Sequence, residues 1–236
     1  MYYGKQKKYA VGIDLGGTTI TAGIVDENYK ILKKKTCDTE LPKPEEMIEH
    51  KMADLCQAVL AENGMTIKDI VWVGIGTPGS VNSQDGVVEF NANFGYFNWA
   101  IREHMETLLG CRVFVENDAN AAGYGEYIAG GARGTRNAVV VTLGTGIGGG
   151  VILDGKIFSG SNFAGAELGH MVIQKDGRGC QCGRNGCWEK YASTRALVED
   201  TKTAMAAHPN SKMWKLVNDD ISKVNGKNCF CGKGCR

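Results

Sequence analysis

The stretch YAVGIDLGGTTITAGIVDENYKILKKKT, residues 9–36, decides the fold of this chain. Its apolar runs are interrupted at Gly16-Gly17 and again at residues 26–29. Glycine pairs and Asp/Asn clusters between apolar runs are turn signals. The pattern therefore predicts three consecutive strands that form an antiparallel meander.

Helix and strand signals alternate after the meander. Pro44 opens the first helix and Gly64 ends it, and Gly110 ends the second helix. The mostly apolar strand DIVWVGIG is expected to be buried on both faces. The predicted elements are a helix over 44–64, a strand over 69–76, a helix over 99–109, a strand over 111–117 and a helix from about 119. This order predicts an α/β fold.

The beginning of the chain is repeated at an offset of 128 residues. Both copies read strand, Gly-rich turn, strand and Asp-containing turn. The matching positions are Ala10, Val11, Leu15, Gly16, Ile24 and Asp26 in the first copy and Ala138, Val139, Leu143, Gly144, Ile152 and Asp154 in the second. We therefore expect two related α/β domains, residues 1–128 and 129–236, that face one another. Each would offer backbone N–H groups to a ligand, and a phosphate donor is the natural occupant.

Composition narrows the class of protein. The chain has 236 residues, 43% of them apolar and 22% charged, and a formal net charge of +1. Such a balance gives no overall basic field for nucleic acid or an anionic membrane, so we expect neither as a partner. No stretch resembles a signal peptide or a membrane span, which predicts a cytoplasmic protein. Nine cysteines, six of them crowded into 180–187 and 229–235, favour metal ligation over a disulfide framework.

The glycines at 144–149, GTGIGG, do not predict a dinucleotide-binding motif, because a hairpin and not a helix follows them. No P-loop motif is present either. Either Gly-rich turn alone could serve only to tighten a hairpin. Two copies, the first of which carries Asp14 and Thr18-Thr19, favour phosphate binding, with Asp14 holding Mg²⁺ through water.

The segment VENDANAA, residues 115–122, places Asn117 and Asp118 where a strand ends and a helix begins. Ligands of open α/β sheets bind at such edges. Asp118 could cap the helix, or it could be a general base that accepts a hydroxyl proton during phosphoryl transfer. The local sequence leaves both roles open.

The spacing of His170, Cys180, Cys182 and Cys187 predicts a metal site. Four soft N/S ligands within eighteen residues indicate a closed, tetrahedral structural Zn²⁺ site. Glu167 precedes the histidine and Glu189 follows the last cysteine, so a folded zinc loop would bring two carboxylates together. Such a pair suits the hydroxyls of a sugar, although either carboxylate alone could simply be solvated.

Six motifs, in this order, resemble the ROK (repressor, ORF, kinase) family, and most closely its bacterial glucokinases. They are DLGGTTITAGIVD, GIGTPGSV, VENDANAA, LGTGIGGG, GAELGHM and CQCGRNGCWEKYAS. The resemblance extends from about residue 9 to residue 227. It implies two duplicated domains of the actin-like ATPase and ribonuclease H-like kind, with an interdomain cleft that takes the sugar and ATP-Mg²⁺ against the Gly-rich turns. It also implies ATP-dependent phosphorylation of glucose at the 6-hydroxyl, and the family tends to form homodimers.

The resemblance also implies roles for single residues. Asp118 matches the catalytic base. The sugar ligands would be Gly79, Asn93, Asn117, Glu167, His170 and Glu189, and the phosphate and magnesium region would comprise Asp14, Gly16, Gly17, Thr18, Thr19, Gly144, Thr145 and Gly146. His170 would use one ring nitrogen for zinc and the other for the sugar. Next to Asn93, the order of Asn91 and Ala92 is inverted relative to the family's usual Ala-Asn.

Other members of the family define the alternatives. Some are sugar-responsive repressors with a DNA-binding domain ahead of the first strand, for which the eight residues before Tyr9 leave no room. Others phosphorylate fructose, allose or N-acetylmannosamine and share most of these motifs. Overall resemblance favours glucose, and no single residue decides the sugar.

The last residues, NCFCGKGCR, depart from the family, which continues through further helices and a Gly-rich turn near the adenosine. Cys229, Cys231 and Cys235 imitate the zinc motif but lack a fourth ligand. Our hypothesis is a frameshift, because codons for this segment, moved by one base, can read Thr-Ala-Phe-Ala-Ala-Lys-Ala-Ala, a strong helix former. On that hypothesis the second domain is truncated and kinase activity is weak or absent. A non-catalytic sugar-binding role is then the alternative.

Overall fold

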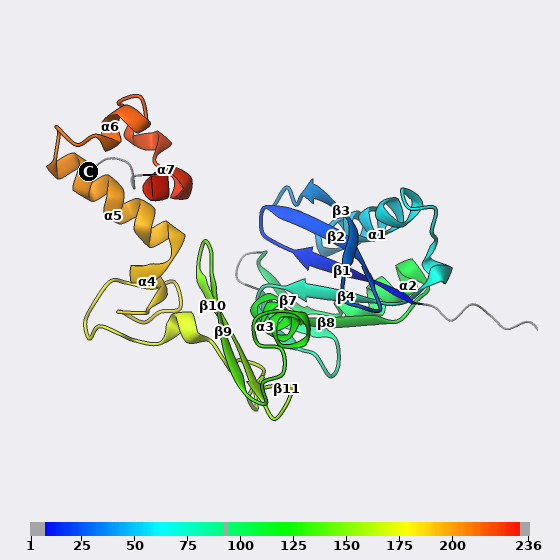
Figure 1. Cartoon of the computed structure of the whole chain (residues 1–236). Helices are drawn as coiled ribbons and strands as arrows, with labels where there is room; N and C mark the ends of the chain where they lie inside the picture. The colour runs from blue at the N-terminus through cyan, green and yellow to red at the C-terminus, as the bar shows by residue number, and fades with distance from the viewer. Residues whose placement is uncertain (1–7, 92–93, 232–236) are drawn as a thin grey trace, which may run out of the picture. The chain divides into compact units, whose positions relative to one another are not determined.

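A five-stranded mixed sheet organises the first part of the chain. The computed structural model describes residues 8–91 and 94–231 (Figure 1). The strands of this sheet are β1 (Tyr9–Leu15), β2 (Thr19–Asp26), β3 (Ile31–Asp38), β4 (Ile70–Thr77) and β8 (Val113–Asn117). Their order is β3-β2-β1-β4-β8, antiparallel among β1, β2 and β3 and parallel from β1 through β4 to β8. The predicted meander is confirmed.

Three helices pack against this sheet: α1 (Glu45–Ala61), α2 (Ile101–Leu109) and α3 (Asp118–Ala129). Pro44 stands at the start of α1, and Gly110 ends α2 in the left-handed conformation at φ 64°, as the sequence predicts. Helices α1 and α2 enclose the main apolar core with one face of the sheet. Helix α3 lies on the other face, because a Cβ on Gly76 would be 3.5 Å from the Cβ of Ala121.

The expectation that strand 69–76 is buried on both faces is wrong. Val71 and Trp72 of β4 are 47% and 41% exposed. The ring of Trp72 meets Phe114 of β8 edge to face, with the centroids 5.8 Å apart, and the Arg112 guanidinium lies over Phe114. Because α3 packs near the carboxyl ends of β4 and β8, the amino-terminal part of this face stays exposed in the described chain.

Two smaller sheets follow in the chain. The first consists of β5 (Ser80–Asn82), β6 (Val87–Asn91) and β7 (Tyr96–Trp99), in that order. The second consists of β9 (Ala138–Leu143), β10 (Ile147–Leu153) and β11 (Lys156–Ile157), in the order β11-β10-β9. Strand β10 directly follows the glycines at 144–146, which confirms that these glycines do not open a helix.

The chain divides into two compact units. The first comprises residues 1–139 and 150–165, and the second comprises residues 140–149 and 166–236. The boundary predicted between residues 128 and 129 stays a prediction. The remaining helical segments are η1 (Ile67–Asp69), η2 (Leu168–His170), α4 (Glu189–Ala192), α5 (Thr194–Ala207), α6 (Met213–Leu216), η3 (Ile221–Lys223) and α7 (Gly226–Cys231). Among the described residues, no helix is both long enough and apolar enough to cross a membrane.

Strand β3 forms one edge of the five-stranded sheet. Its residues Lys33, Lys34 and Lys35 follow one another, and the first two are exposed. On its inner side, β3 pairs with β2 from Thr19 opposite Asp38 to Val25 opposite Ile31. Positive charge therefore lines the edge strand along its middle.

A buried carboxylate joins three elements of the first unit. Glu49 of α1 is 4% exposed and accepts a hydrogen bond from the indole Nε1 of Trp99, at the end of β7. It also pairs with Nδ1 of His104 on α2 at 2.7 Å. The hydrogen bond to Glu49 raises the pKa of His104 above its ordinary value of 6.5, and the charges of Glu103 and Glu45 add to the effect. A charged imidazole is therefore the favoured partner of this carboxylate.

The His104 pair makes stability depend on pH. A raised folded-state pKa means that the pair stabilises the fold fully below the unfolded pKa of about 6.5, and that this contribution is lost as pH rises through the folded pKa. His104→Gln should therefore flatten the fall in Tm between about pH 6 and about pH 8. Thermal melts over this range test it. The control is His50→Gln, which replaces an exposed histidine of α1. Equal slopes in all three proteins would contradict the assignment.

Candidate functional site

The turn between β1 and β2 carries the first group of predicted phosphate residues. The Gly16 N–H donates to the Thr19 carbonyl at 2.9 Å, and a Cβ on Gly16 would lie 3.0 Å from that oxygen. Fully buried Thr39 holds the turn from the end of β3. Its hydroxyl donates to the Gly16 carbonyl at 2.7 Å, and its N–H donates to the Thr18 carbonyl at 2.8 Å. Sequence reasoning missed Thr39, because a single threonine after a strand carries no pattern.

Asn117 caps helix α3. Its side-chain oxygen accepts the N–H groups of Ala119 and Asn120 at 3.0 and 3.1 Å. Its amide Nδ2 donates to the Gly79 carbonyl at 3.1 Å, which ties the helix start to the loop after β4. Of the two roles left open for Asp118, capping therefore belongs to Asn117. Asp118 is the first residue of the helix itself.

Asp118 lies at the carboxyl edge of the main sheet, near Asp14. Strand β4 lies between β1, which carries Asp14, and β8, which leads into α3 and Asp118. Gly76 of β4 pairs with Asp14 and lies against the Asp118 backbone. Burial raises the pKa of Asp118, the hydrogen bond from the Ala119 N–H lowers it, and the Asp14 charge raises it further. Burial also raises the pKa of Asp14. The first unit thus holds two interacting carboxylates, one at the positive end of a helix.

The loop after β4 is held in a conformation that requires glycine. Gly79 has φ 109°, and a Cβ there would lie 2.3 Å from the Phe90 carbonyl oxygen. Fully buried Asn91 donates from Nδ2 to the Pro78 carbonyl at 2.7 Å, and its Oδ1 accepts the Phe94 N–H at 3.3 Å. Asn91 is thus a second residue of the site region that sequence reasoning did not assign. The predicted sugar ligand Asn93 lies outside the described residues.

In the second unit, the Gly144–Gly146 turn is bonded to the segment that follows the zinc motif. The Gly144 N–H donates to the Gly146 carbonyl at 3.0 Å across Thr145, and the Thr194 N–H donates to the Gly144 carbonyl at 2.9 Å. The Glu189 carboxylate accepts the Ile147 N–H at 3.1 Å. A Cβ on Gly146 would lie 2.2 Å from the same carboxylate, so a larger residue there would displace the Glu189 side chain. Glu189, a predicted sugar ligand, therefore contacts the predicted phosphate turn.

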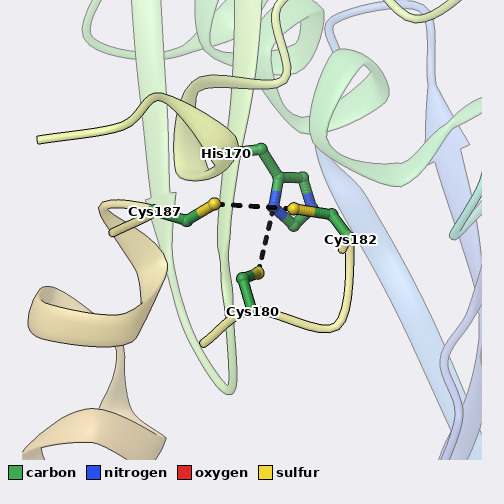
Figure 2. Close-up of side chains that lie close together, drawn as sticks. All are labelled: His170, Cys180, Cys182 and Cys187. Atoms are coloured by element: carbon green, nitrogen blue, oxygen red, sulfur yellow. Dashed lines mark hydrogen bonds between the residues drawn. The ribbon is translucent and has the colours of Figure 1, made fainter. Parts of the chain in front are cut away.

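The predicted zinc ligands come together. His170, Cys180, Cys182 and Cys187 offer ligand atoms that all lie within 4.8 Å of one another, and Figure 2 shows the four side chains directed at a common centre. Cys180 Sγ is 3.6 Å from His170 Nδ1, and Cys182 Sγ is 3.5 Å from Cys187 Sγ. A tetrahedron with Zn–S bonds of about 2.3 Å has edges of about 3.8 Å. The cluster therefore fits a four-coordinate zinc ion.

Short backbone contacts shape the loop that carries these ligands. The Cys180 N–H donates to the Arg184 carbonyl at 2.9 Å, and the Gly183 N–H donates to the Cys180 carbonyl at 3.0 Å. Gly183 and Gly186 both have φ 84°, which favours glycine at each position. The turn thus brings Cys180 and Cys182 back toward Cys187.

The thiols of the cluster differ in their tendency to ionise. Desolvation raises the pKa of Cys182, but hydrogen bonds from the Arg184 backbone and guanidinium and from the neighbouring thiols lower it to about 6. Desolvation and the adjacent thiols raise the pKa of buried Cys187 to about 12. Of these two thiols, Cys182 is the one that ionises more readily when no metal is present. Thiolate is the form that binds metal.

Glu167 comes directly before the short helix η2, and His170 is the last residue of that helix. The Glu167 carbonyl accepts the His170 N–H at 3.1 Å. His170 turns Nδ1 toward Cys180, which leaves Nε2 as the nitrogen on the far side of the ring. This orientation agrees with the expectation that one nitrogen binds zinc and the other is available to a second partner.

Cys229 does not belong to the zinc cluster. It packs against the small core of Met205, Val217 and Val224 in the second unit. The side chain of Cys231 and the whole of Cys235 lie outside the described part of the structure. The expectation that these three cysteines form a poor metal site stays a prediction.

Each unit carries its own share of the predicted residues. The first unit holds Asp14, Gly16, Gly17, Thr18, Thr19, Gly79, Asn117 and Asp118. The second holds Gly144, Thr145, Gly146, Glu167, His170, Glu189 and the three zinc-loop cysteines. Within each unit these residues gather at turns and at element ends, where backbone N–H groups and carboxylates are available to a ligand.

Comparison with known proteins identifies relatives of the whole matched segment. The chain is 38% identical over 224 residues to a glucokinase of Thermotoga maritima, covering 93% of this chain and 68% of the relative. It is 43% identical over 199 residues to a glucokinase of Streptomyces coelicolor, covering 84% of this chain and 61% of the relative. The chain therefore spans about two thirds of the length of these relatives.

A solved structure also matches the fold. The ROK family glucokinase of Streptomyces griseus, in complex with glucose and AMPPNP, superposes with a TM-score of 0.79 at 37% identity, covering 93% of this chain and 69% of that one. This match confirms the expected α/β fold of the actin-like ATPase and ribonuclease H-like class. The ROK family model itself matches residues 10–229. This chain is a member of the ROK family.

Proposed function

We propose that this protein is a sugar kinase that transfers the γ-phosphoryl group of ATP to the 6-hydroxyl of glucose. The observation that carries the proposal is the state of Asp118, a half-buried carboxylate with a raised pKa at the first position of α3, beside Asp14. Asn117 provides the cap, and Asp118, whose Oδ1 accepts the Ala119 N–H at 2.8 Å, is the carboxylate beside it that we assign to a substrate hydroxyl. The relatives at 38% and 43% identity, both glucokinases, support this choice of reaction and sugar.

Asp118 acts in this proposal as the general base. Its carboxylate accepts the proton of the attacking hydroxyl as the phosphoryl group is transferred. A raised pKa brings a carboxylate closer to neutral pH and makes it a better proton acceptor. The positive end of α3 favours the ionised form of Asp118, which is the form that accepts a proton. Asn117 and Gly79 fix the backbone from which Asp118 projects.

The other predicted residues divide into phosphate and sugar ligands. The two Gly-rich turns, 16–19 and 144–146, present backbone N–H groups and threonine hydroxyls to the phosphates of ATP. Asp14 offers the hard oxygen donor that Mg²⁺ prefers, and the ion when bound would neutralise charge on the transferred group. Gly79, Asn93, Asn117, Glu167, His170 and Glu189 are our sugar ligands. The alternative substrate is another hexose, or N-acetylmannosamine.

The zinc ion in this proposal is structural. His170, Cys180, Cys182 and Cys187 would complete a tetrahedral shell and leave no position for a reactive water. The metal would fix His170 Nδ1, so that Nε2 faces the sugar as an oriented hydrogen-bonding group. We also propose that the protein is cytoplasmic and that its full-length form is a homodimer.

The base role of Asp118 is tested with Asp118→Asn. An amide cannot accept the proton, so kcat should fall by about 10² to 10⁴ while the Kd for glucose changes little. In the parent protein, kcat should decline on the acidic side as Asp118 takes up a proton. A coupled ADP assay and calorimetric titration with glucose measure the two effects. Asp54→Asn, an exposed change in α1, is the matched control.

Three outcomes of this experiment would be decisive against parts of the proposal. Unchanged kcat in Asp118→Asn removes the base role. A parent protein that binds glucose but never forms ADP is a sugar-binding protein and not a kinase. Faster turnover of N-acetylmannosamine or fructose than of glucose, measured in the same assay, would transfer the proposal to another sugar.

The zinc proposal predicts about one Zn²⁺ per chain by elemental analysis. Cys182→Ser and Cys187→Ser should each lose the metal and lower Tm, because each removes one of four ligands. Cys37→Ser, a half-buried cysteine outside the zinc loop, should keep it. A metal-free parent protein with an unchanged Tm in chelator would contradict this site.

A further inference from the structure

Arg178 lies inside the zinc loop, between the ligands His170 and Cys180, and makes an unusual number of polar contacts there. Its guanidinium stacks over the ring of Tyr191 at 4.9 Å from the centroid. Nη1 donates to the Lys190 carbonyl at 3.0 Å, and Nη2 pairs with Asp200 of α5 at 2.7 Å. We name Arg178, Tyr191 and Asp200 the clasp.

The backbone of Arg178 takes part as well. Its N–H donates to the Tyr191 hydroxyl at 2.7 Å, and its carbonyl accepts the Gly186 N–H at 2.8 Å. A Cβ on the preceding Gly177 would lie 2.1 Å from the Tyr191 hydroxyl, so glycine permits this close approach. The loop and helix α4 are thus joined at several atoms without help from the metal ligands themselves.

The elements that the clasp joins are the ones that carry Glu189. Helix α4 begins at Glu189, and the next two residues, Lys190 and Tyr191, are the ones that Arg178 contacts. On the opposite side, the Glu189 carboxylate accepts the Ile147 N–H at the Gly144–Gly146 turn. The orientation of this carboxylate therefore depends on how α4 is held.

The ion pair of the clasp adds little to the stability of the fold. Arg178 and Asp200 are 43% and 47% exposed, and exposed ion pairs contribute little to folding. A guanidinium that combines a carbonyl contact, an ion pair and a ring contact instead holds a backbone in one geometry. Residues that contact a ligand-binding side chain commonly fix its orientation in this way.

We propose that Arg178 is a positioning residue, which acts through Tyr191 and Lys190 to orient Glu189 toward the sugar and the Gly144–Gly146 turn. The inference rests on the proposed sugar-kinase function, in which Glu189 is a sugar ligand. Arg178 lies between two of the predicted zinc ligands in the sequence, but its proposed role is separate from metal binding.

The test compares Arg178→Ala, Arg178→Lys and Tyr191→Phe in the whole chain. In Arg178→Ala, the Kd for glucose should rise by about tenfold, while zinc content and Tm stay as in the parent protein. Arg178→Lys keeps the charge facing Asp200 but loses the planar fork, so it should restore binding only in part. Tyr191→Phe removes the hydroxyl that accepts the Arg178 N–H and should weaken binding less than Arg178→Ala. Lys175→Ala, an exposed change in the same loop, should leave the Kd unchanged.

A second readout does not need the sugar. The Ile147 amide, which donates to Glu189, should exchange its hydrogen faster in Arg178→Ala than in the parent, as measured by ¹⁵N NMR. Parental Kd and exchange rate in Arg178→Ala would overturn the inference, and so would a joint loss of zinc and Tm, which would mean a structural role. A parent protein that fails to bind glucose would overturn the proposed function, and the Ile147 exchange rate would still report whether the clasp orients Glu189.

Discussion

The hydrogen bonds of Asn117 are the constraint on which the first unit's share of the site depends. One side chain closes the start of α3 with its oxygen and holds the Gly79 carbonyl with its amide. Because these bonds run in two directions, they fix the end of β8, the start of α3 and the loop after β4 together. Asp118, the next residue, is therefore held in a defined position, while Asn117 provides the cap. An N-cap exchanged for alanine usually costs about 1 kcal/mol, and here it would also release the loop.

In the second unit, different hydrogen bonds hold the predicted site residues in place. There the Gly144–Gly146 turn is held by Thr194 and by the Glu189 carboxylate, both of which follow the zinc loop in the chain. A loop of this kind has little apolar material of its own, and the small core of Met205, Val217 and Val224 lies elsewhere in the unit. Polar contacts therefore take the place of apolar packing around the predicted sugar ligands of this unit.

The features that could be predicted from the sequence depend on neighbours along the chain. The meander follows from turns at Gly16-Gly17 and 26–29, the end of α2 follows from Gly110, and the ligand cluster follows from the spacing of His170 and the cysteines. Thr39, Asn91 and Glu49 could not be predicted, because their partners are set by tertiary structure. Glu49, for example, meets Trp99 and His104, which are 50 and 55 residues away in the chain. The exposure of Trp72 was missed for a related reason, since an apolar strand does not tell which of its faces a helix covers.

The lysines of β3 lie on an edge strand of the main sheet. An edge strand leaves a row of backbone groups open to pairing with another chain, and charged side chains discourage such pairing. With Lys33, Lys34 and Lys35 in the middle of β3, a second copy of this strand would have to bring like charges together. Repulsion of this kind is screened within about 10 Å at 0.1 M salt. The repulsion between two copies of β3 is therefore stronger at low ionic strength than at high ionic strength.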